Sequence, residues 1–539
     1  MDSKPQDKNC YEVKCSEELG RYLVANRDIS PLEVVIRESP LVCAPADDPN
    51  YEDMGRMCLG CFARIPSNST TSSCSKCGWP VCDIDCQTIS HHSSNECEFF
   101  EKQKISFKTL PFQHLLNETI FILRCILLKQ RNPVAFNNVI LKFEHHTQVR
   151  MEKPDCVEKD KKILANLSEI QALSNSKWFD LDEDEIIQIS GIINVNAFSS
   201  TKLEDECRSR RVRRRVTICQ CLYPTATLLA HQCVPNATWT LSASPHFEQT
   251  IRTTVPIKKG EMIAIAYAPQ EIMWPTLQRL ISSNDVAHFI CHCFRCQDPT
   301  ELGSFIGAIK CGKCVRDIGG CENEDVRFLL PNNPIDPESL WSCQNPNCGA
   351  TKTVEQVIKT VHQIERRFNR IKNSVYSTQT EISELEELYK ESLENCLHKN
   401  HYLLQEISLR IVNRNSLSIY CLDSDDLERF LFHCNSILNL SSVLSPGFCR
   451  ARALIQFYTG QAMMVRARKY MKGRDSADNK TLLYNMFSPI YKLQKDSYSY
   501  FKTEDENDNR HRAVKGYNQY VACLVEEMEE CLKAMQIQE

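Results

Sequence analysis

The feature that most constrains this chain is the number and spacing of its cysteines. The 539 residues include 30 cysteines, and many of them fall in closely spaced pairs. Such pairs are typical of thiolate metal ligands, because two nearby cysteines can hold one ion from a single tight turn. Disulfides are the alternative, but residues 1–8 lack the apolar segment of a secretory signal. We therefore expect zinc sites in a protein that stays inside the cell.

The densest group lies in residues 58–97. Its potential ligands are Cys58, Cys61, Cys74, Cys77, Cys82, Cys86, His91, His92 and Cys97. Eight of these suffice for two tetrahedral Zn2+ ions. A segment of roughly forty residues has too little apolar material for its own core, so metal binding must supply folding free energy.

A second group is one ligand short of a complete site. Cys291, Cys293 and Cys296 provide three thiolates, whereas a structural zinc ion takes four ligands. Cys233 lies in the segment Ala-His-Gln-Cys-Val-Pro-Asn, and we expect it to complete this site.

A third group joins two pairs across a long connection. Cys311-x2-Cys314 is followed, 28 residues on, by Cys343-x4-Cys348. The sequence thus predicts three zinc ions in the first two groups and a fourth here. Among the other cysteines, we expect buried thiols in apolar helical stretches at Cys125, Cys434 and Cys523.

Composition and charge exclude several classes of protein. Hydrophobic residues make up 42% and charged residues 25%, as in globular proteins, and the net charge is -5. Such a balance does not suit a protein that coats nucleic acid. Residues 208–215 carry six arginines; they suit either a nuclear-import or nucleic-acid patch or a solvated strand edge, and the strand-like Val216-Thr217-Ile218 that follows favours the edge. No stretch has the ~18 apolar residues of a membrane span.

The hydrophobic pattern changes along the chain. Residues 10–46 and 196–268 predict short strands, and residues 105–195 predict helices with a polar connector near Met151 to Lys162. From residue 354 apolar residues recur at helical spacing, which predicts antiparallel helix pairs of a TPR-like array. The array is either an interaction surface or a brace for the rest. Near the end the pattern continues at Leu524, Met528, Leu532 and Met535.

Taken in order, these segments resemble the SET and MYND domain (SMYD) family. Residues 58–97 resemble a MYND finger, and residues 20–29 resemble the first strands of a SET domain. Other matches are the central SET motifs at 194–198 and 222–236, the strand at 263–267 that ends in the SET tyrosine, and a cysteine-rich post-SET element at 289–301. The wording Gly-Arg-x-Leu-Val-Ala and Leu-Ala-His is similar to the arthropod SmydA branch.

This resemblance implies an α+β multidomain fold. A β-rich SET domain is split by a MYND-type zinc finger and a helical insert, and it is followed by a post-SET zinc site and a C-terminal all-α TPR-like domain. The implied boundaries are 10–46 for the SET N-terminal strands, 58–97 for the finger, 100–195 for the helical insert, 196–275 for the SET core, 276–305 for the post-SET element, 306–350 for a Cys-rich extension and 351–539 for the TPR-like domain.

The family implies an S-adenosyl-L-methionine-dependent methyltransferase (a transferase) acting on lysines of histones or other proteins, with a role in transcription regulation in the nucleus and cytoplasm. It also implies interleaved chelation of zinc. Cys58, Cys61, Cys82 and Cys86 hold one ion, and Cys74, Cys77, a histidine and Cys97 hold the other. We prefer His92 as this histidine, with His91 as the alternative.

Residues carried over from the family motifs define a site. Tyr267 matches the catalytic tyrosine beside the transferring methyl group. The cofactor-binding positions are Gly20, Arg21, Glu144, Asn196, His231 and Phe289, the last stacking on adenine. Because a substrate lysine with a reference pKa of ~10.4 must lose its proton, an apolar channel and alignment do most of the catalytic work.

Three positions depart from the family pattern. Tyr22 replaces a glycine beside the cofactor, Ala230 replaces an asparagine, and Ala287 replaces a second active-site tyrosine, for which His288 is a possible substitute. These departures motivate a second hypothesis: a catalytically weak or inactive adaptor, or corepressor, whose MYND finger binds proline-rich peptides. Under either hypothesis we expect protein partners, no direct nucleic-acid binding and no membrane.

Overall fold

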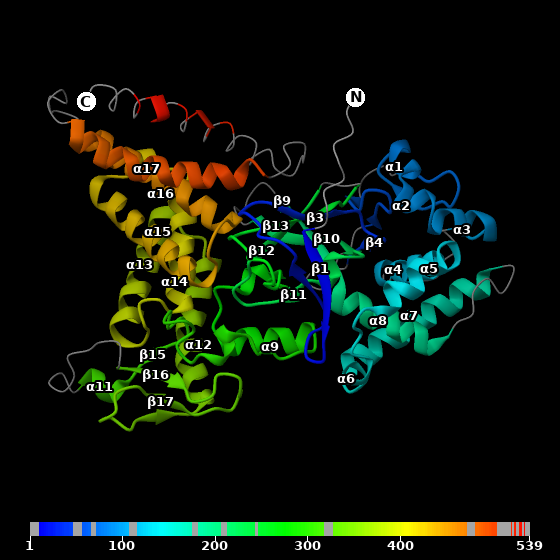
Figure 1. Cartoon of the computed structure of the whole chain (residues 1–539), viewed down its shortest axis with the longest axis horizontal. Helices are drawn as coiled ribbons and strands as arrows, with labels where there is room; N and C mark the ends of the chain where they lie inside the picture. The colour runs from blue at the N-terminus through cyan, green and yellow to red at the C-terminus, as the bar shows by residue number, and fades with distance from the viewer. Residues whose placement is uncertain are drawn as a thin grey trace.

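The structure, a computed structural model, describes residues 10–46, 56–65, 72–106, 116–174, 182–205, 213–242, 246–316, 327–471 and 480–503, with residues 519, 522, 523, 526, 528–530 and 533. It is a mixed protein of helices and several sheets, which confirms the predicted mixture of helices and strands. The sheets lie between helices of residues 84–196 on one side and helices of residues 354–501 on the other (Figure 1). None of the described helices is long and apolar enough to cross a membrane.

Short strands from two distant parts of the chain build the central sheets. They are β1 (Tyr11–Ser16), β2 (Gly20–Ala25), β3 (Val34–Glu38), β4 (Val42–Pro45), β9 (Phe198–Asp205), β10 (Arg213–Leu222), β11 (Ala230–His231), β12 (Ala237–Leu241), β13 (Gln249–Thr253) and β14 (Ala264–Ile265). The strand orders are β12-β13-β3, β4-β10-β9 and β11-β14. Leu23, Ile36 and Ile251 meet in one buried core. Strands from residues 34–45 therefore pair with strands from residues 213–253, and their inward-facing side chains share one core. Of the arginine run, residues 208–212 lie outside the described residues.

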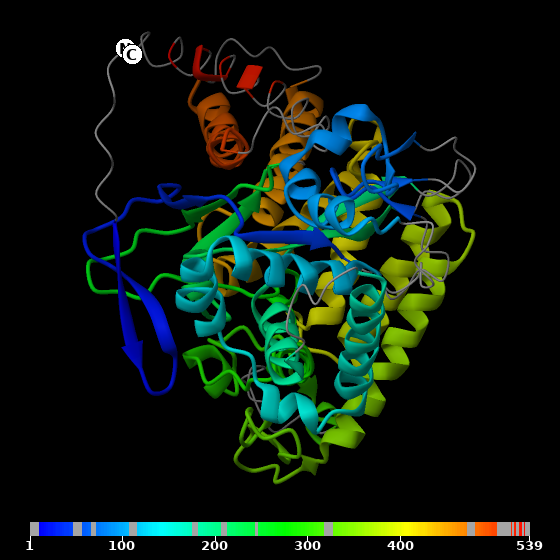
Figure 2. The same cartoon turned by 90° about the vertical axis from the view of Figure 1, so that its right-hand side faces the viewer.

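The β1–β2 hairpin projects from the body of the protein (Figure 2). Gly20 begins β2 with φ of 63°, a left-handed conformation that glycine adopts without strain. The base of the hairpin is fixed to the core, because the Ala25 N–H donates to the Glu261 carbonyl at 2.9 Å. The tip is thereby left free to border a groove described below.

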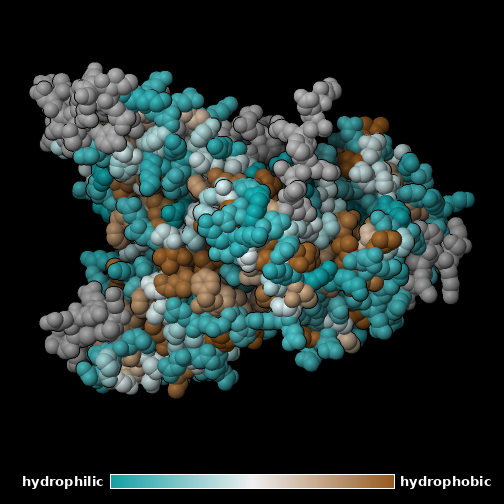
Figure 3. Space-filling view, in the orientation of Figure 1, coloured by the Kyte–Doolittle hydropathy of each residue, from teal (hydrophilic) through white to brown (hydrophobic). Residues whose placement is uncertain are grey.

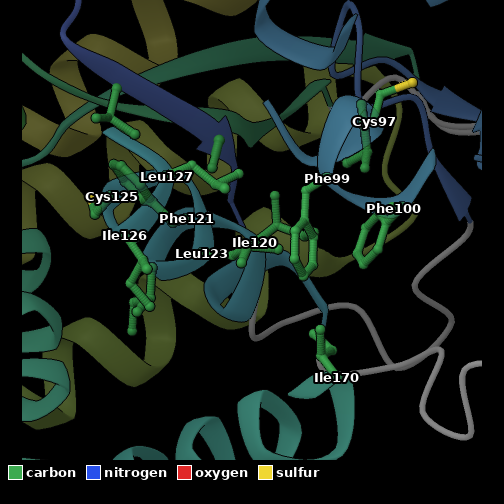
Figure 4. Packing of buried hydrophobic residues seen from close by; sticks show 14 of the residues in the cluster. Cys97, Phe99, Phe100, Ile120, Phe121, Leu123, Cys125, Ile126, Leu127 and Ile170 are labelled. Atoms are coloured by element: carbon green, nitrogen blue, oxygen red, sulfur yellow. The ribbon is translucent and has the colours of Figure 1, made fainter. Parts of the chain in front are cut away.

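Residues 56–196 form small hairpins followed by helices. The elements are β5 (Arg56–Met57), β6 (Arg64–Ile65), β7 (Ser72–Ser73), β8 (Pro80–Val81), α1 (Ile84–Thr88), α2 (Ser90–Ser93), α3 (Glu96–Gln103), α4 (Leu116–Arg131), α5 (Pro133–Asn138), α6 (Thr147–Met151), α7 (Pro154–Leu173) and α8 (Glu183–Asn196). Phe99 and Phe100 of α3 face Ile120 of α4, whereas the Cys97 sulfur points away from them (Figure 4). Helix α3 therefore joins the cysteine-rich segment to a helical core.

The polar connector predicted near Met151 to Lys162 is wrong. Helix α7 begins at Pro154, and its first two turns are part of that segment. Proline suits the first turn of a helix, and α7 buries Ile163, Leu167 and Ile170 further along. The buried apolar residues of α7 begin only at Ile163. The first turns therefore have few apolar contacts of their own, and packing of the later turns stabilises the helix as a whole.

A small sheet follows the central strands. Its elements and the helices before it are α9 (Thr276–Val286), α10 (Phe294–Gln297), β15 (Ile309–Lys310), α11 (Gly312–Arg316), β16 (Phe328–Pro331), β17 (Trp341–Cys343) and β18 (Thr351–Lys352). The strand order is β15-β16-β17-β18, with antiparallel neighbours.

The remaining helices pack in sequence order. They are α12 (Val354–Asn373), α13 (Thr378–Asn395), α14 (Tyr402–Asn415), α15 (Ser424–Leu444), α16 (Arg450–Met471) and α17 (Lys480–Phe501). Each one contacts the next, so the helical pattern from residue 354 is confirmed. Met528 is buried as the pattern predicts, but Cys523 is exposed, contrary to expectation, while Cys125 and Cys434 are buried. Leu524, Leu532 and Met535 lie outside the described residues.

Candidate metal clusters and cofactor groove

Four clusters bring together the sixteen predicted metal ligands. In each cluster the ligand atoms lie within 4.8 Å of one another. The members are Cys58, Cys61, Cys82 and Cys86; Cys74, Cys77, His92 and Cys97; Cys233, Cys291, Cys293 and Cys296; and Cys311, Cys314, Cys343 and Cys348. Cysteines as much as 63 residues apart in sequence, such as Cys233 and Cys296, thus meet at one point.

The spacing of the sulfur atoms fits zinc. Four thiolates about 2.3 Å from a tetrahedral ion stand about 3.8 Å from one another. The pairs Cys61–Cys82, Cys74–Cys97 and Cys233–Cys291 are separated by 3.5, 3.6 and 3.9 Å. A disulfide would bring two sulfurs to about 2.05 Å. The clusters therefore have the donor set and the spacing of four-ligand zinc sites.

The structure places His92, and not His91, beside the thiols of its cluster. The His92 Nε2 atom lies 3.6 Å from the Cys77 sulfur, and its Nδ1 atom lies 2.8 Å from Glu96 Oε1. An Nδ1–H that donates to a carboxylate leaves Nε2 free for a metal ion. The His91 ring instead lies near the rings of Phe62 and Phe247, tilted against both.

A buried ion pair supports His92 from behind. Glu96 accepts from Arg124 Nε and Nη2, both at 2.7 Å, and neither side chain is more than 1% exposed. Burial raises the pKa of Glu96, but the guanidinium and His92 together hold that pKa below its usual value. Arg124 also donates to the carbonyls of Cys43 and Leu59. One network thus joins the cluster, α4 and the central strands.

Arginines surround the cluster that contains Cys233. Arg279 donates from Nε to the Cys233 sulfur and from Nη2 to the Cys296 sulfur, both at 3.3 Å. Glu301 accepts from Arg279 at 2.8 Å and from Arg295 at 3.0 Å. All three side chains are buried. The positive charge of Arg279 beside the Cys233 and Cys296 sulfurs favours thiolates, which are the metal-binding form.

A groove of about 2940 Å³ is lined by residues of the central strands and by residues of helices α14, α15 and α16. In the orientation of Figure 1, apolar residues gather near the middle of the visible face of the molecule (Figure 3). The groove is lined by all seven residues predicted for catalysis and cofactor binding, namely Gly20, Arg21, Glu144, Asn196, His231, Tyr267 and Phe289. Residues from six separate places in the sequence therefore converge on one concave surface.

Three aromatic rings form one wall of the groove. The ring centroids of His231, Tyr267 and Phe289 lie 5.2 to 6.0 Å apart. The Tyr267 N–H donates to His231 Nδ1 at 3.1 Å, so the proton of His231 is on Nε2, 3.3 Å from the Cys233 sulfur. His231 of this wall therefore contacts the third cluster, that of Cys233, Cys291, Cys293 and Cys296.

The Tyr267 side chain has a fixed hydroxyl and an open ring. The hydroxyl donates to the Leu229 carbonyl at 3.0 Å, and the side chain is 45% exposed to the groove. Burial of its polar end raises the pKa of Tyr267 to about 12. At neutral pH the hydroxyl keeps its proton and is available for hydrogen bonding.

Another part of the groove wall is polar. Asn196 donates to the Glu144 carbonyl at 2.7 Å, and Arg21 donates to the Lys142 carbonyl at 2.7 Å. The N–H groups of His145 and His146 donate to the Glu144 carboxylate and, against partial burial, hold its pKa below the usual value. This wall therefore presents a carboxylate next to fixed backbone.

Two of the three departures from the family pattern border the groove. Ala230 and Ala287 are groove-lining residues. Tyr22 is not among them, although its neighbours Gly20 and Arg21 are. His288 does not replace the missing tyrosine: its ring nitrogens contact Lys153 Nζ at 3.0 Å and Asn194 Oδ1 at 3.1 Å.

The sequence did not predict the residues that connect the segment of Phe289 to the helices of residues 147–196. His146 and Asn194 line the groove, and Lys153 holds His288 next to Phe289. Burial and the Lys153 charge hold the pKa of His288 below its usual value, so the ring is a neutral connector. The available indications were that His146 lies two residues after Glu144 and that Asn194 begins the motif at 194–198.

Comparison with known proteins identifies homologues. No family model matches the chain. The SET domain-containing protein SmydA-8, isoform B, of Drosophila melanogaster is 27% identical over 64% of this chain and 67% of its own length. A SET and MYND domain-containing protein of Dictyostelium discoideum is 26% identical over 63% of this chain and 96% of its own length. N-lysine methyltransferase SMYD2-B of Danio rerio is 23% identical over 45% of this chain and 51% of its own length.

These homologues are SET and MYND domain proteins, so the predicted resemblance is confirmed. The cysteine clusters, whose geometry suits zinc, agree with it. The match spans about two thirds of the SmydA-8 isoforms. Homologues with methyltransferase names include the zebrafish protein and the Arabidopsis thaliana histone-lysine N-methyltransferase ASHR1.

Proposed function

We propose that this protein transfers a methyl group from S-adenosyl-L-methionine to a lysine of a protein substrate, histone or non-histone. The observation that carries the proposal is the convergence of Gly20, Glu144, Asn196, Tyr267 and Phe289 on one groove, built upon a cysteine cluster. The first three clusters would hold three zinc ions. For location we propose the nucleus and cytoplasm, with a role in transcription regulation.

The groove residues fit the chemical parts of this cofactor. Phe289 would offer a ring face to adenine, and Glu144 would accept hydrogen bonds from hydroxyl or ammonium groups. When bound, the cofactor would supply an electrophilic methyl group. Ala287 and Ile290 border the groove, and such apolar side chains favour a neutral lysine amine over a charged one. The Tyr267 oxygen can then align the amine.

Calorimetric titration with S-adenosylmethionine tests the proposal. We expect binding by the wild type, and a loss of affinity on the order of tenfold to a hundredfold in Phe289→Ala, because one ring face is worth about 1–3 kcal/mol. Phe294→Ala is the matched control: Phe294 is 54% exposed and lies between two ligands of the same cluster. It should bind normally. Absence of binding by the wild type would overturn the proposal.

The second candidate is a non-catalytic adaptor whose MYND-type finger binds a proline-rich peptide. It is favoured by Ala230 and Ala287, which leave two groove positions without the amide and the hydroxyl of the family pattern. Binding of a proline-rich peptide library by a protein that fails to bind cofactor would support this candidate.

A further inference from the structure

We propose that Cys311, Cys314, Cys343 and Cys348 bind a structural zinc ion that fastens helix α14 to the groove. This cluster shares no residue with the groove, and it goes beyond the proposed methyl transfer. Its role would be to hold the β15–β18 sheet and the helical array in one arrangement.

The donor set is complete and held in place. The sulfurs of Cys311 and Cys348, and those of Cys314 and Cys343, are each 3.6 Å apart, close to the edge of about 3.8 Å expected for a tetrahedral tetrathiolate site. Asn345 donates to the Cys314 sulfur at 3.5 Å. Gly349, with φ of 63°, lets the chain turn directly after Cys348.

The two cysteine pairs lie at the two ends of one module. Cys311 follows β15 directly, whereas Cys348 is followed by β18 and then by α12. An ion shared by the pairs joins the beginning of the module to its end and closes the intervening loop. Such a closure restricts the unfolded module and stabilises its folded arrangement.

The segment before Cys311 pairs with the connection between α13 and α14. The N–H of Lys310 donates to the Cys396 carbonyl at 2.7 Å, and the N–H of Tyr402 donates to the Ile306 carbonyl at 2.9 Å. Cys311, Cys314 and Cys348 also share a hydrophobic cluster with Leu385, Leu397 and Leu403 of the helical array. The metal cluster therefore lies where the β15–β18 sheet contacts the connection between α13 and α14, which we call the joint. A bound ion at this place would restrict the motion of the start of α14.

Helix α14 in turn forms part of the groove. Tyr402, Gln405, Glu406 and Leu409 are groove-lining residues. The Gln278 side chain of α9 donates to the Tyr402 hydroxyl at 2.6 Å. Displacing the joint would move this wall away from Tyr267 and Phe289. Occupancy of the fourth cluster would thereby hold the groove-lining residues of α14 in place.

The test combines metal counting with hydrogen exchange on the full chain, without any cofactor. Protein purified without chelator should contain four zinc ions, and Cys343→Ser should contain three. Cys343 is suitable because it is the one partly exposed ligand of this cluster. In the variant, exchange in residues 306–310 and 396–409 should accelerate on the order of tenfold or more, while β13 stays protected. Cys421→Ser, an exposed cysteine between α14 and α15, should match the wild type in both measurements.

Several results would overturn the inference. Three zinc ions in the wild type, or iron in the fourth cluster, would refute the assigned ion. A variant with three ions and unchanged exchange at α14 would refute the fastening role. If Cys343→Ser does not fold, alkylation of the wild type decides: the four thiols should resist alkylation until a chelator is added, and immediate reaction would refute binding.

Discussion

At the scale of single residues, Tyr267 is held at two points while its ring borders the groove. Its N–H donates to His231 and its hydroxyl to the Leu229 carbonyl. The ring contacts His231 and Phe289 without help from the oxygen. The oxygen can therefore be removed with little change to the wall.

We expect Tyr267→Phe to lower turnover between tenfold and a thousandfold while cofactor affinity changes little. A hydroxyl that aligns the amine acts more strongly in the transition state than in the ground state, and Ala287 offers no second hydroxyl. Tritium transfer from labelled cofactor to a panel of lysate proteins, with calorimetry beside it, measures both effects. Equal transfer by both proteins would remove Tyr267 from the mechanism.

Glu96 provides a second test at residue scale. Glu96→Gln would leave the Arg124 charge buried without its counter-charge, at a cost of about 3–5 kcal/mol, and would weaken the support of His92. We expect a lower unfolding temperature and loss of one zinc ion. Glu98→Gln is the control, because Glu98 lies on the same helix but forms an exposed pair with Lys102. Equal stability of the two variants would contradict the role assigned to Glu96.

At the scale of elements, helix α15 buries a titratable ring in the helical array. His433 is 3% exposed and its Nδ1 atom lies 2.9 Å from the Ser408 hydroxyl. Burial lowers the pKa of His433 to about 4, against about 6.5 in an unfolded chain. Between these values the unfolded chain binds a proton that the folded array excludes.

The free energy of unfolding of the array should therefore be greatest above pH 6.5 and should fall as the pH drops through this window. By pH 5 we expect a loss on the order of 2 kcal/mol from this residue. Urea unfolding followed by circular dichroism at several pH values measures it. In His433→Gln the slope should become shallower, whereas the exposed His362→Gln should keep the wild-type slope. A steep slope in both variants would rule out His433 as its source.

The sequence predicts elements well where the pattern is local. Helix α12 follows from apolar residues at helical spacing, and its N-terminus has a capping box of Thr353 and Gln356. The first turns of α7 could not be predicted, because their polar residues are helical only through the buried stripe further along. Cys523 was misjudged because an apolar neighbourhood in sequence does not decide which side of a helix is covered.

At the scale of the whole molecule, the third cluster should affect the groove, and the cluster of Cys74, Cys77, His92 and Cys97 should not. Cys233→Ser should lower both metal content and cofactor affinity, since the Cys233 sulfur contacts His231 and shares a cluster with Phe289. Cys74→Ser should lose zinc and thermal stability but retain cofactor affinity, because Cys74 does not border the groove. Elemental analysis and calorimetry check both. Equal loss of affinity in the two variants would contradict this division.

Long-range order is what the sequence could not supply. Spacing in the sequence predicts that two nearby cysteines bind the same ion. It does not specify a distant ligand, and Cys233 was assigned to the site of Cys291 only because that site lacked a fourth ligand. The contacts of Lys153 with His288 and of Glu96 with Arg124 span 135 and 28 residues. No local pattern specifies such contacts, because tertiary packing of separate elements creates them. The resemblance supplied the groove residues, and the geometry supplied their partners.

The buried pair of Glu96 and Arg124 also sets the limits of transplantation. A cassette cut after Cys97 would carry the carboxylate without its arginine, and the charge would enter a foreign interior uncompensated. A transferable unit must therefore extend at least from residue 56 to residue 131, so that it includes α4 as the donor of the guanidinium. For protein engineering, the cysteine-rich segment should therefore be transferred together with α4, whose Arg124 neutralises the buried carboxylate of Glu96.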